Sequence, residues 1–130
     1  MQDPRKKTNR WVINATRALR AATMENQKSH ALVVDLDGNR MYTISEEMDE
    51  QARNAAAEKG FQLPGGIRIV DIQFPHKDRA VSGTTEIFYY PGGYSDQALI
   101  HLEDDESQRF AYKLEPLMPK IRVLEEWTAY

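Results

Sequence analysis

The side chains that could carry chemistry in this sequence begin with three histidines. His30, His76 and His101 stand far apart in the chain, and none has a metal-binding His-x-x-x-His spacing or a nucleophile signature beside it. There are no cysteines, which excludes a thiolate zinc site, a cysteine nucleophile and a disulfide framework. His101 lies in an alternating strand pattern, so we interpret it as a satisfied or exposed histidine and not as a catalytic one.

Serine and glycine motifs also fail to match catalytic or phosphate-binding patterns. Ser82-Gly83 is not part of a Gly-x-Ser-x-Gly elbow. The glycine pairs at 65–66 and 92–93 are not followed by a helix start with Lys-Ser/Thr, so they indicate turns and not phosphate cradles. Because the sequence shows no convergent set of polar groups, we expect neither enzymatic activity nor a cofactor.

One acidic run could bind a cation. Residues 103–106 are four consecutive acids, and oxygen ligands gathered in a turn can hold calcium, with Asp104, Asp105 and Glu106 as the candidate ligands. The run lacks the spaced Asp-x-Asp-x-Asp-Gly pattern of a calcium loop. We therefore favour a solubilising hairpin tip and keep calcium as the alternative.

The charge of the chain is unevenly distributed. The net charge is −3, but residues 1–28 carry seven Lys and Arg against two acids, which leaves +5 there and −8 in the remainder. The basic face of such a helix, on an otherwise acidic domain, is either exposed to solvent or in contact with acidic neighbours or with a membrane surface. Nucleic-acid binding is not favoured, because the chain is acidic overall and no predicted strand has a basic patch interleaved with aromatic residues.

The element that positions these charges is a long N-terminal helix. Asp3 suits its N-cap, Pro4 suits its first turn, and the helical period continues to about Lys28. We predict that one stripe packs on a sheet through Trp11, Ala15, Leu19 and Ala22, in a row that also holds Ala18 and Asn26, with Val12 and Thr23 at its edge.

Beyond the first helix the pattern is mainly that of antiparallel strands. A hairpin over 31–44 turns at Asp37-Gly38-Asn39, and a short polar helix near 46–59 is capped by Ser45. Strands follow at 67–72, 86–90, 98–102, 109–114 and 120–124. Helix followed by runs of strand indicates the α+β class, with residues 1–130 as a single domain of 1–28 and 29–130.

Three stretches of the sequence form a recognisable series. The alanine- and arginine-containing segment 15–26 runs into the β-type 31–34, residues 63–69 begin a strand with Leu-Pro-Gly-Gly, and residues 87–95 contain the turn Pro91, Gly92 and Gly93. In this order the three stretches resemble the type IV pilin-like superfamily, and in particular the H-type minor pseudopilins of type II secretion and the FimT-like minor pilins. The second stretch is similar to that family's Leu-Pro-x-Gly strand entry and the third to its Phe-x-Pro-x-Gly turn.

This resemblance implies a structural subunit and not an enzyme. It implies a methylated protein anchored in the bacterial inner membrane by a preceding apolar helix, with this domain in the periplasm and other pseudopilins as its partners. It also implies assembly into a short filament that drives protein export; a minor type IV pilin in pilus assembly or DNA uptake is the alternative. Apolar side chains interleaved with arginines lie away from the packing stripe, and we predict a subunit interface there: Ile13, Arg17, Arg20, Ala21 and Met24.

Overall fold

The computed structural model describes residues 3–130, which form two helices and eight strands. The secondary-structure elements, in chain order, are α1 (Pro4–Asn26), β1 (His30–Asp35), β2 (Arg40–Ser45), α2 (Glu50–Glu58), β3 (Phe61–Gln62), β4 (Arg68–Gln73), β5 (Thr84–Tyr89), β6 (Ala98–Glu103), β7 (Arg109–Leu114) and β8 (Arg122–Leu124).

The N-terminal helix α1 begins and ends through standard capping contacts. Its predicted N-cap is confirmed, since Asp3 Oδ1 accepts a hydrogen bond from the backbone N–H of Arg5 at 2.9 Å, and Pro4 occupies the first turn. The helix ends at Asn26, two residues before the predicted end, where Gln27 adopts a left-handed conformation with φ of 56°. Local sequence therefore determines where this helix begins.

The first antiparallel sheet has the order β3-β2-β1-β5. The predicted hairpin is confirmed, with Leu32 opposite Thr43 in its register. Its turn also ties the two sheets together, because the Asn39 side chain donates to the Ile67 carbonyl at 2.7 Å and accepts from the Ile69 N–H at 2.9 Å. Asn39 has φ of 54°, a left-handed conformation that asparagine tolerates better than most residues.

The start predicted for the second helix is wrong. Ser45 is the last residue of β2, and α2 begins only at Glu50, where the Asp49 side chain accepts from the Ala52 N–H at 2.8 Å. Serine and aspartate can both cap a helix. Asp49 is the cap here because Ser45 pairs with His30 of β1 and so stays in the extended conformation. No residue of α2 is buried.

The second antiparallel sheet has the order β4-β6-β7-β8. All five residues from Ala98 to Leu102 in its central strand are buried, so both faces of β6 are covered. The register between β4 and β6 shifts between Ile69 and Asp71, where a bulge interrupts the pairing. The two-residue strand β3, which the sequence patterns did not predict, extends the other sheet at its edge.

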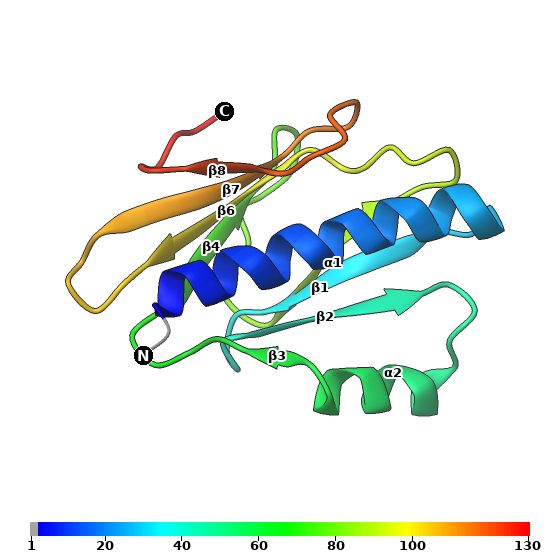
Figure 1. The fold of residues 1–130 in the computed structure, drawn as a ribbon, viewed down its shortest axis with the longest axis horizontal. Helices are drawn as coiled ribbons and strands as arrows, with labels where there is room; N and C mark the ends of the chain where they lie inside the picture. Colours follow the sequence, from blue (N-terminus) through cyan, green and yellow to red (C-terminus); the bar gives the residue numbers. More distant parts are fainter. Residues whose placement is uncertain (1–2) are drawn as a thin grey trace.

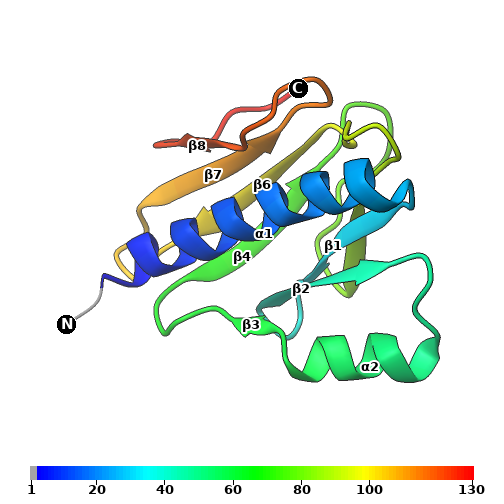
Figure 2. The ribbon, with the colours of Figure 1, turned by 45° about the vertical axis from the view of Figure 1, so that its right-hand side comes forward.

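The helix α1 lies lengthwise across the two sheets and joins them into one main core. Figure 1 shows α1 between the sheet of β4, β6, β7 and β8 and the sheet of β1 and β2, and Figure 2 shows the same arrangement after rotation. Apolar side chains from α1 and from both sheets form this core, among them Val12, Leu19, Leu32, Ile87, Ile100 and Phe110. A smaller cluster lies on the outer side of β1, under α2: Ala31, Val33 and Ile44.

Candidate functional site

The buried stripe of α1 is built largely from threonines. Thr8, Val12, Thr16, Leu19 and Thr23 are its buried residues. The hydroxyl groups of the threonines donate to carbonyls one turn earlier in the helix, each at 2.8 Å. A hydroxyl that is satisfied within its own helix can be buried without the cost of an unpaired polar group. These short side chains let α1 lie close to the sheets.

The residues predicted for helix–sheet packing lie mostly on the flank of that stripe. Leu19 is buried, whereas Trp11, Ala15 and Ala22 are half-buried. The Trp11 ring stacks on the ring of Phe61, with the ring centroids 5.0 Å apart. The stripe differs from the prediction because periodicity counts threonine as polar and cannot show that its hydroxyl is satisfied by the helix backbone.

The opposite face of α1 carries the residues predicted as a subunit interface. Arg17 and Ala21 are exposed, Met24 is 48% exposed, and Ile13 and Arg20 are half-buried. Several cations of this helix have no ion-pair partner within residues 3–130, namely Lys6, Lys7, Arg10, Arg17 and Arg20. Arg5 differs, because it pairs with Glu125 at 2.7 Å. The outward face of α1 is therefore cationic, with apolar side chains among its charges.

The predicted turn at Pro91, Gly92 and Gly93 lies against the end of this helix. A Cβ atom on Gly93 would lie 2.9 Å from Cγ and 3.0 Å from Sδ of Met24. The two glycines have φ of 98° and 89°, so the turn requires glycine for its backbone as well as for the close approach. The turn therefore contacts Met24 at the edge of the exposed face.

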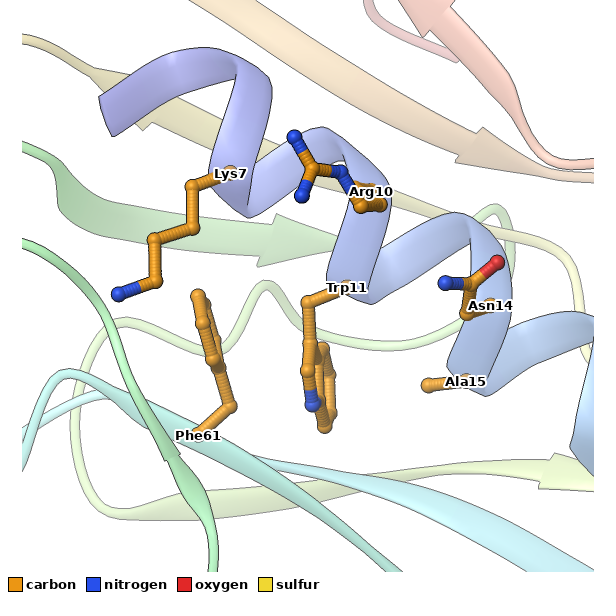
Figure 3. Close-up of a pocket in the computed structure, with 6 residues that line it drawn as sticks. All are labelled: Lys7, Arg10, Trp11, Asn14, Ala15 and Phe61. Carbon is orange, nitrogen blue, oxygen red and sulfur yellow. The ribbon is translucent and has the colours of Figure 1, made fainter. Parts of the chain in front are cut away.

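A groove runs along the side of α1 that carries Trp11 and Ala15, where the helix meets β3. A cavity of about 630 Å³ is lined there by Lys7, Arg10, Trp11 and Phe61, with Asn14 and Ala15 (Figure 3). A second cavity of about 350 Å³ shares Trp11 and Ala15 and continues past Ala22 towards His30 and Thr43. In the groove, aromatic and alanine side chains lie beside the cations Lys7 and Arg10. The exposed cationic surface of α1 therefore continues onto this side of the helix.

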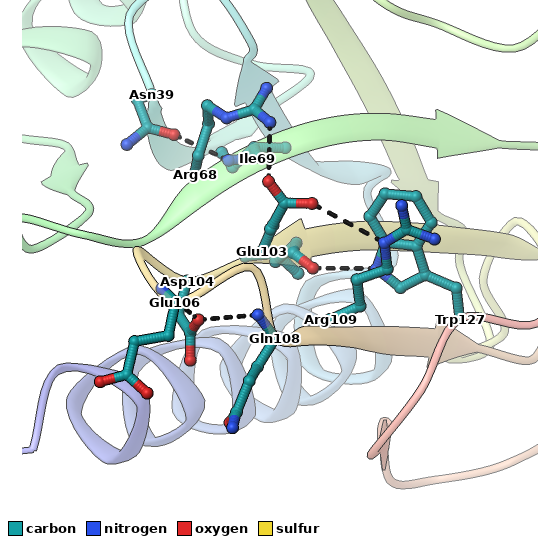
Figure 4. Close-up of polar contacts among 10 residues, drawn as sticks. Asn39, Arg68, Ile69, Glu103, Asp104, Glu106, Gln108, Arg109 and Trp127 are labelled. Carbon is teal, nitrogen blue, oxygen red and sulfur yellow. Dashed lines mark hydrogen bonds and ion pairs between the residues drawn. The ribbon is translucent and has the colours of Figure 1, made fainter.

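The acidic turn is held by hydrogen bonds within its own hairpin. Asp104 Oδ1 accepts from the backbone N–H groups of Glu106 and Gln108, each at 2.9 Å (Figure 4). Glu103 pairs with Arg68 at 3.1 Å and with Arg109 at 3.7 Å. Residues 3–130 contain no group of three or more His, Asp or Glu side chains arranged to hold a metal ion. The predicted calcium ligands Asp104, Asp105 and Glu106 therefore gain no structural support.

His101 of β6 forms a buried polar pair with Asp71 of β4 and also contacts the C-terminal segment. Its Nδ1 lies 2.6 Å from Oδ1 of Asp71, and its Nε2 donates to the Thr128 carbonyl at 2.8 Å. The Trp127 ring stacks on the imidazole, with the ring centroids 4.8 Å apart, and Trp127 Nε1 donates to the Leu102 carbonyl. Sequence analysis missed this pair, because its members lie 30 residues apart and no local motif connects them. Its contacts are those of a structural histidine.

The long N-terminal helix α1 lies across two antiparallel sheets, and this arrangement defines a pilin-like α+β fold. No protein-family model and no curated protein matches the sequence. Within residues 3–130, no helix is long and apolar enough to cross a membrane.

Among solved structures, the chain is similar to the minor pseudopilin EpsH from the Type 2 Secretion System of Vibrio cholerae. The TM-score is 0.66, and the alignment covers 98% of this chain and 100% of that chain at 13% sequence identity. At this identity the similarity shows the fold alone, which agrees with the fold class expected from the sequence.

Proposed function

We propose that this chain is the periplasmic domain of a minor pseudopilin, a structural subunit of a type II secretion pseudopilus. In this proposal a preceding apolar helix anchors the protein in the inner membrane, and α1 packs against helices of neighbouring pseudopilins. The fold and its full-length likeness to EpsH support the class of protein. The domain acts by recognition and mechanical assembly and catalyses no reaction.

The observation that carries the proposal is the two-sided character of α1. One side is held against both sheets by the stripe from Thr8 to Thr23, which makes the helix a rigid rod. The other side presents Arg17, Ala21 and Met24 to solvent, and the arginine has no ion-pair partner within residues 3–130. Apolar side chains bordered by unpaired cations suit a neighbour with a complementary acidic and apolar face.

The proposal is tested with the double variant Arg17→Glu and Arg20→Glu in the full-length protein. Reversing two charges on the proposed contact face should block assembly and export, because like charges juxtaposed across an interface disfavour association. The fold should be retained, since neither side chain is buried. Secretion of an exported protein and crosslinking to neighbouring pseudopilins measure the effect, and circular dichroism checks the fold.

A matched control carries Lys59→Glu and Lys120→Glu, which change the net charge equally at exposed positions away from α1. Secretion should be normal in this control. Normal secretion in the α1 double variant would contradict the proposed interface. A salt-sensitive gel shift with duplex DNA, abolished by the α1 substitutions, would instead favour the alternative of a FimT-like pilin in DNA uptake, because the same cations suit phosphate groups.

A further inference from the structure

A cleft lined by aromatic and proline side chains lies where β4 ends, beside the turn that follows β5. Its volume is about 450 Å³, and Phe74, Tyr90, Tyr94 and Pro116 are among its lining residues. Phe74 is buried, whereas Tyr94 remains 48% exposed. A concave site of this size with an apolar wall is typical of a binding pocket. None of these residues belongs to the exposed face of α1.

The two tyrosines form a rigid platform on one wall of the cleft. Their ring centroids are 5.0 Å apart in a stacked arrangement. Two backbone hydrogen bonds close the turn: the Tyr90 N–H donates to the Tyr94 carbonyl at 2.8 Å, and the Gly93 N–H donates to the Tyr90 carbonyl at 2.9 Å. The Tyr90 hydroxyl donates to Asp96 at 2.6 Å. A platform fixed before binding loses little conformational entropy when a ligand docks on it.

Hydrogen bonding within the protein determines what the cleft can still offer to a ligand. The carboxylate of Asp96 is engaged at both oxygens, by the Tyr90 hydroxyl and by the Phe88 N–H at 2.9 Å. Lys77, whose ammonium lies 4.1 Å from the Phe74 ring centroid, has no ion-pair partner within residues 3–130. Lys77 and the Gln97 amide therefore remain as hydrogen-bond donors for a ligand, and the lysine can pair with an acidic group.

We propose that this cleft binds a proline-rich extended segment of a partner protein, with an acidic residue of that segment placed at Lys77. A polyproline helix has no internal hydrogen bonds, so its carbonyls are free to accept from donors of a partner, and its rings dock in grooves lined by aromatic side chains. The stacked tyrosines supply the aromatic surface, and Lys77 supplies the complementary charge. Such a contact tethers a partner separately from helix packing on α1.

Exposed apolar residues next to the cleft extend its binding surface. Leu117 is 90% exposed and Met118 is 51% exposed, and both follow directly after Pro116 in the cleft wall. Exposed large apolar side chains beside a cleft are typical of an interaction surface.

The test measures fluorescence anisotropy of a labelled decaproline peptide with two central aspartates, titrated with the chain of residues 1–130. We expect saturable binding, with amide NMR shifts concentrated at Lys77, Tyr94 and Gln97. Tyr94→Ala should weaken binding by about tenfold or more, as the loss of an aromatic anchor does, while Tyr94→Phe should bind normally. Lys77→Ala should remove the preference for this peptide over one with two central lysines.

The control variant is Val81→Ala, which removes an exposed apolar side chain outside the cleft and should leave the affinity unchanged. Absence of anisotropy change and of NMR shifts at millimolar protein would overturn the proposal, as would equal affinity in the tyrosine and alanine forms at position 94. Binding of an oligosaccharide and not the peptide, or self-association through the cleft without peptide binding, would also overturn it.

Discussion

The contact between the Gly93 turn and the end of α1 allows a quantitative prediction. Replacing Gly93 by alanine adds one methyl group at a residue with φ of 89°, a region that side chains rarely adopt. The new Cβ would lie 2.9 Å from Cγ of Met24 and 3.5 Å from Cγ of Arg20. The substitution therefore combines backbone strain with a steric clash against a flexible side chain.

These two effects have different magnitudes. A positive φ costs an alanine about 1–2 kcal/mol relative to glycine. The clash costs less than a clash with backbone, because the methionine can rotate away at about 0.5–1.5 kcal/mol for an unfavourable rotamer. We therefore expect Gly93→Ala to reduce the free energy of unfolding by about 2–3 kcal/mol in total, with strain as the larger part.

Urea unfolding followed by circular dichroism measures this difference. In a double-mutant cycle, Met24→Ala should recover only the smaller, steric part of the loss. Gly65→Ala is the matched control, because a Cβ there would have no atom within 4 Å and the backbone of Gly65 is not in the left-handed region; it should be neutral or slightly stabilising. Full stability of Gly93→Ala, or its complete rescue by Met24→Ala, would refute the assignment of strain to this turn.

Two further predictions concern hydrogen-bonded polar groups. Asp71→Ala should reduce the free energy of unfolding by about 3 kcal/mol, because it removes the buried partner of His101 Nδ1. Glu103→Ala, at a partly exposed ion pair, should cost only about 0–1 kcal/mol. Urea unfolding compares the two variants, and equal losses would contradict a structural role for the pair of Asp71 and His101. The hydrogen bond to Asp96 raises the pKa of Tyr90 to about 12 from its ordinary 10.0, so the folded protein holds this proton more tightly than the unfolded chain. The stabilisation from this proton is complete below pH 10 and is lost as the pH rises towards 12. Between these pH values, the free energy of unfolding measured with urea should therefore fall less steeply in Tyr90→Phe than in the unchanged protein. An identical fall would contradict the contribution of the Tyr90 proton to stability.

Much of the fold follows from local patterns in the sequence. Asp3 followed by proline predicted the start of α1, because a cap and the first turn involve only neighbouring residues. The turn at Asp37-Gly38-Asn39 predicted the first hairpin for the same reason. The start of α2 was missed because two capping residues compete, and strand pairing decides between Ser45 and Asp49.

The candidate site was less accessible to sequence analysis. The exposed arginines of α1 could be placed on one face by helical period alone. The contact of Met24 with Gly93 could not, because it depends on how the helix end meets a turn some 70 residues later in the chain. The aromatic cleft also joins segments that are distant in sequence, from Phe74 to Pro116.

Local sequence thus predicted the first helix, the positions of most strands along the chain and the cationic character of α1, since capping, periodicity and charge are properties of neighbouring residues. Tertiary structure decided which face of α1 is buried, because threonine hydroxyls can be satisfied within the helix and buried against two sheets. It also paired Asp71 with His101 and stacked Trp11 on Phe61. Such contacts depend on the packing of distant segments, which no local pattern encodes.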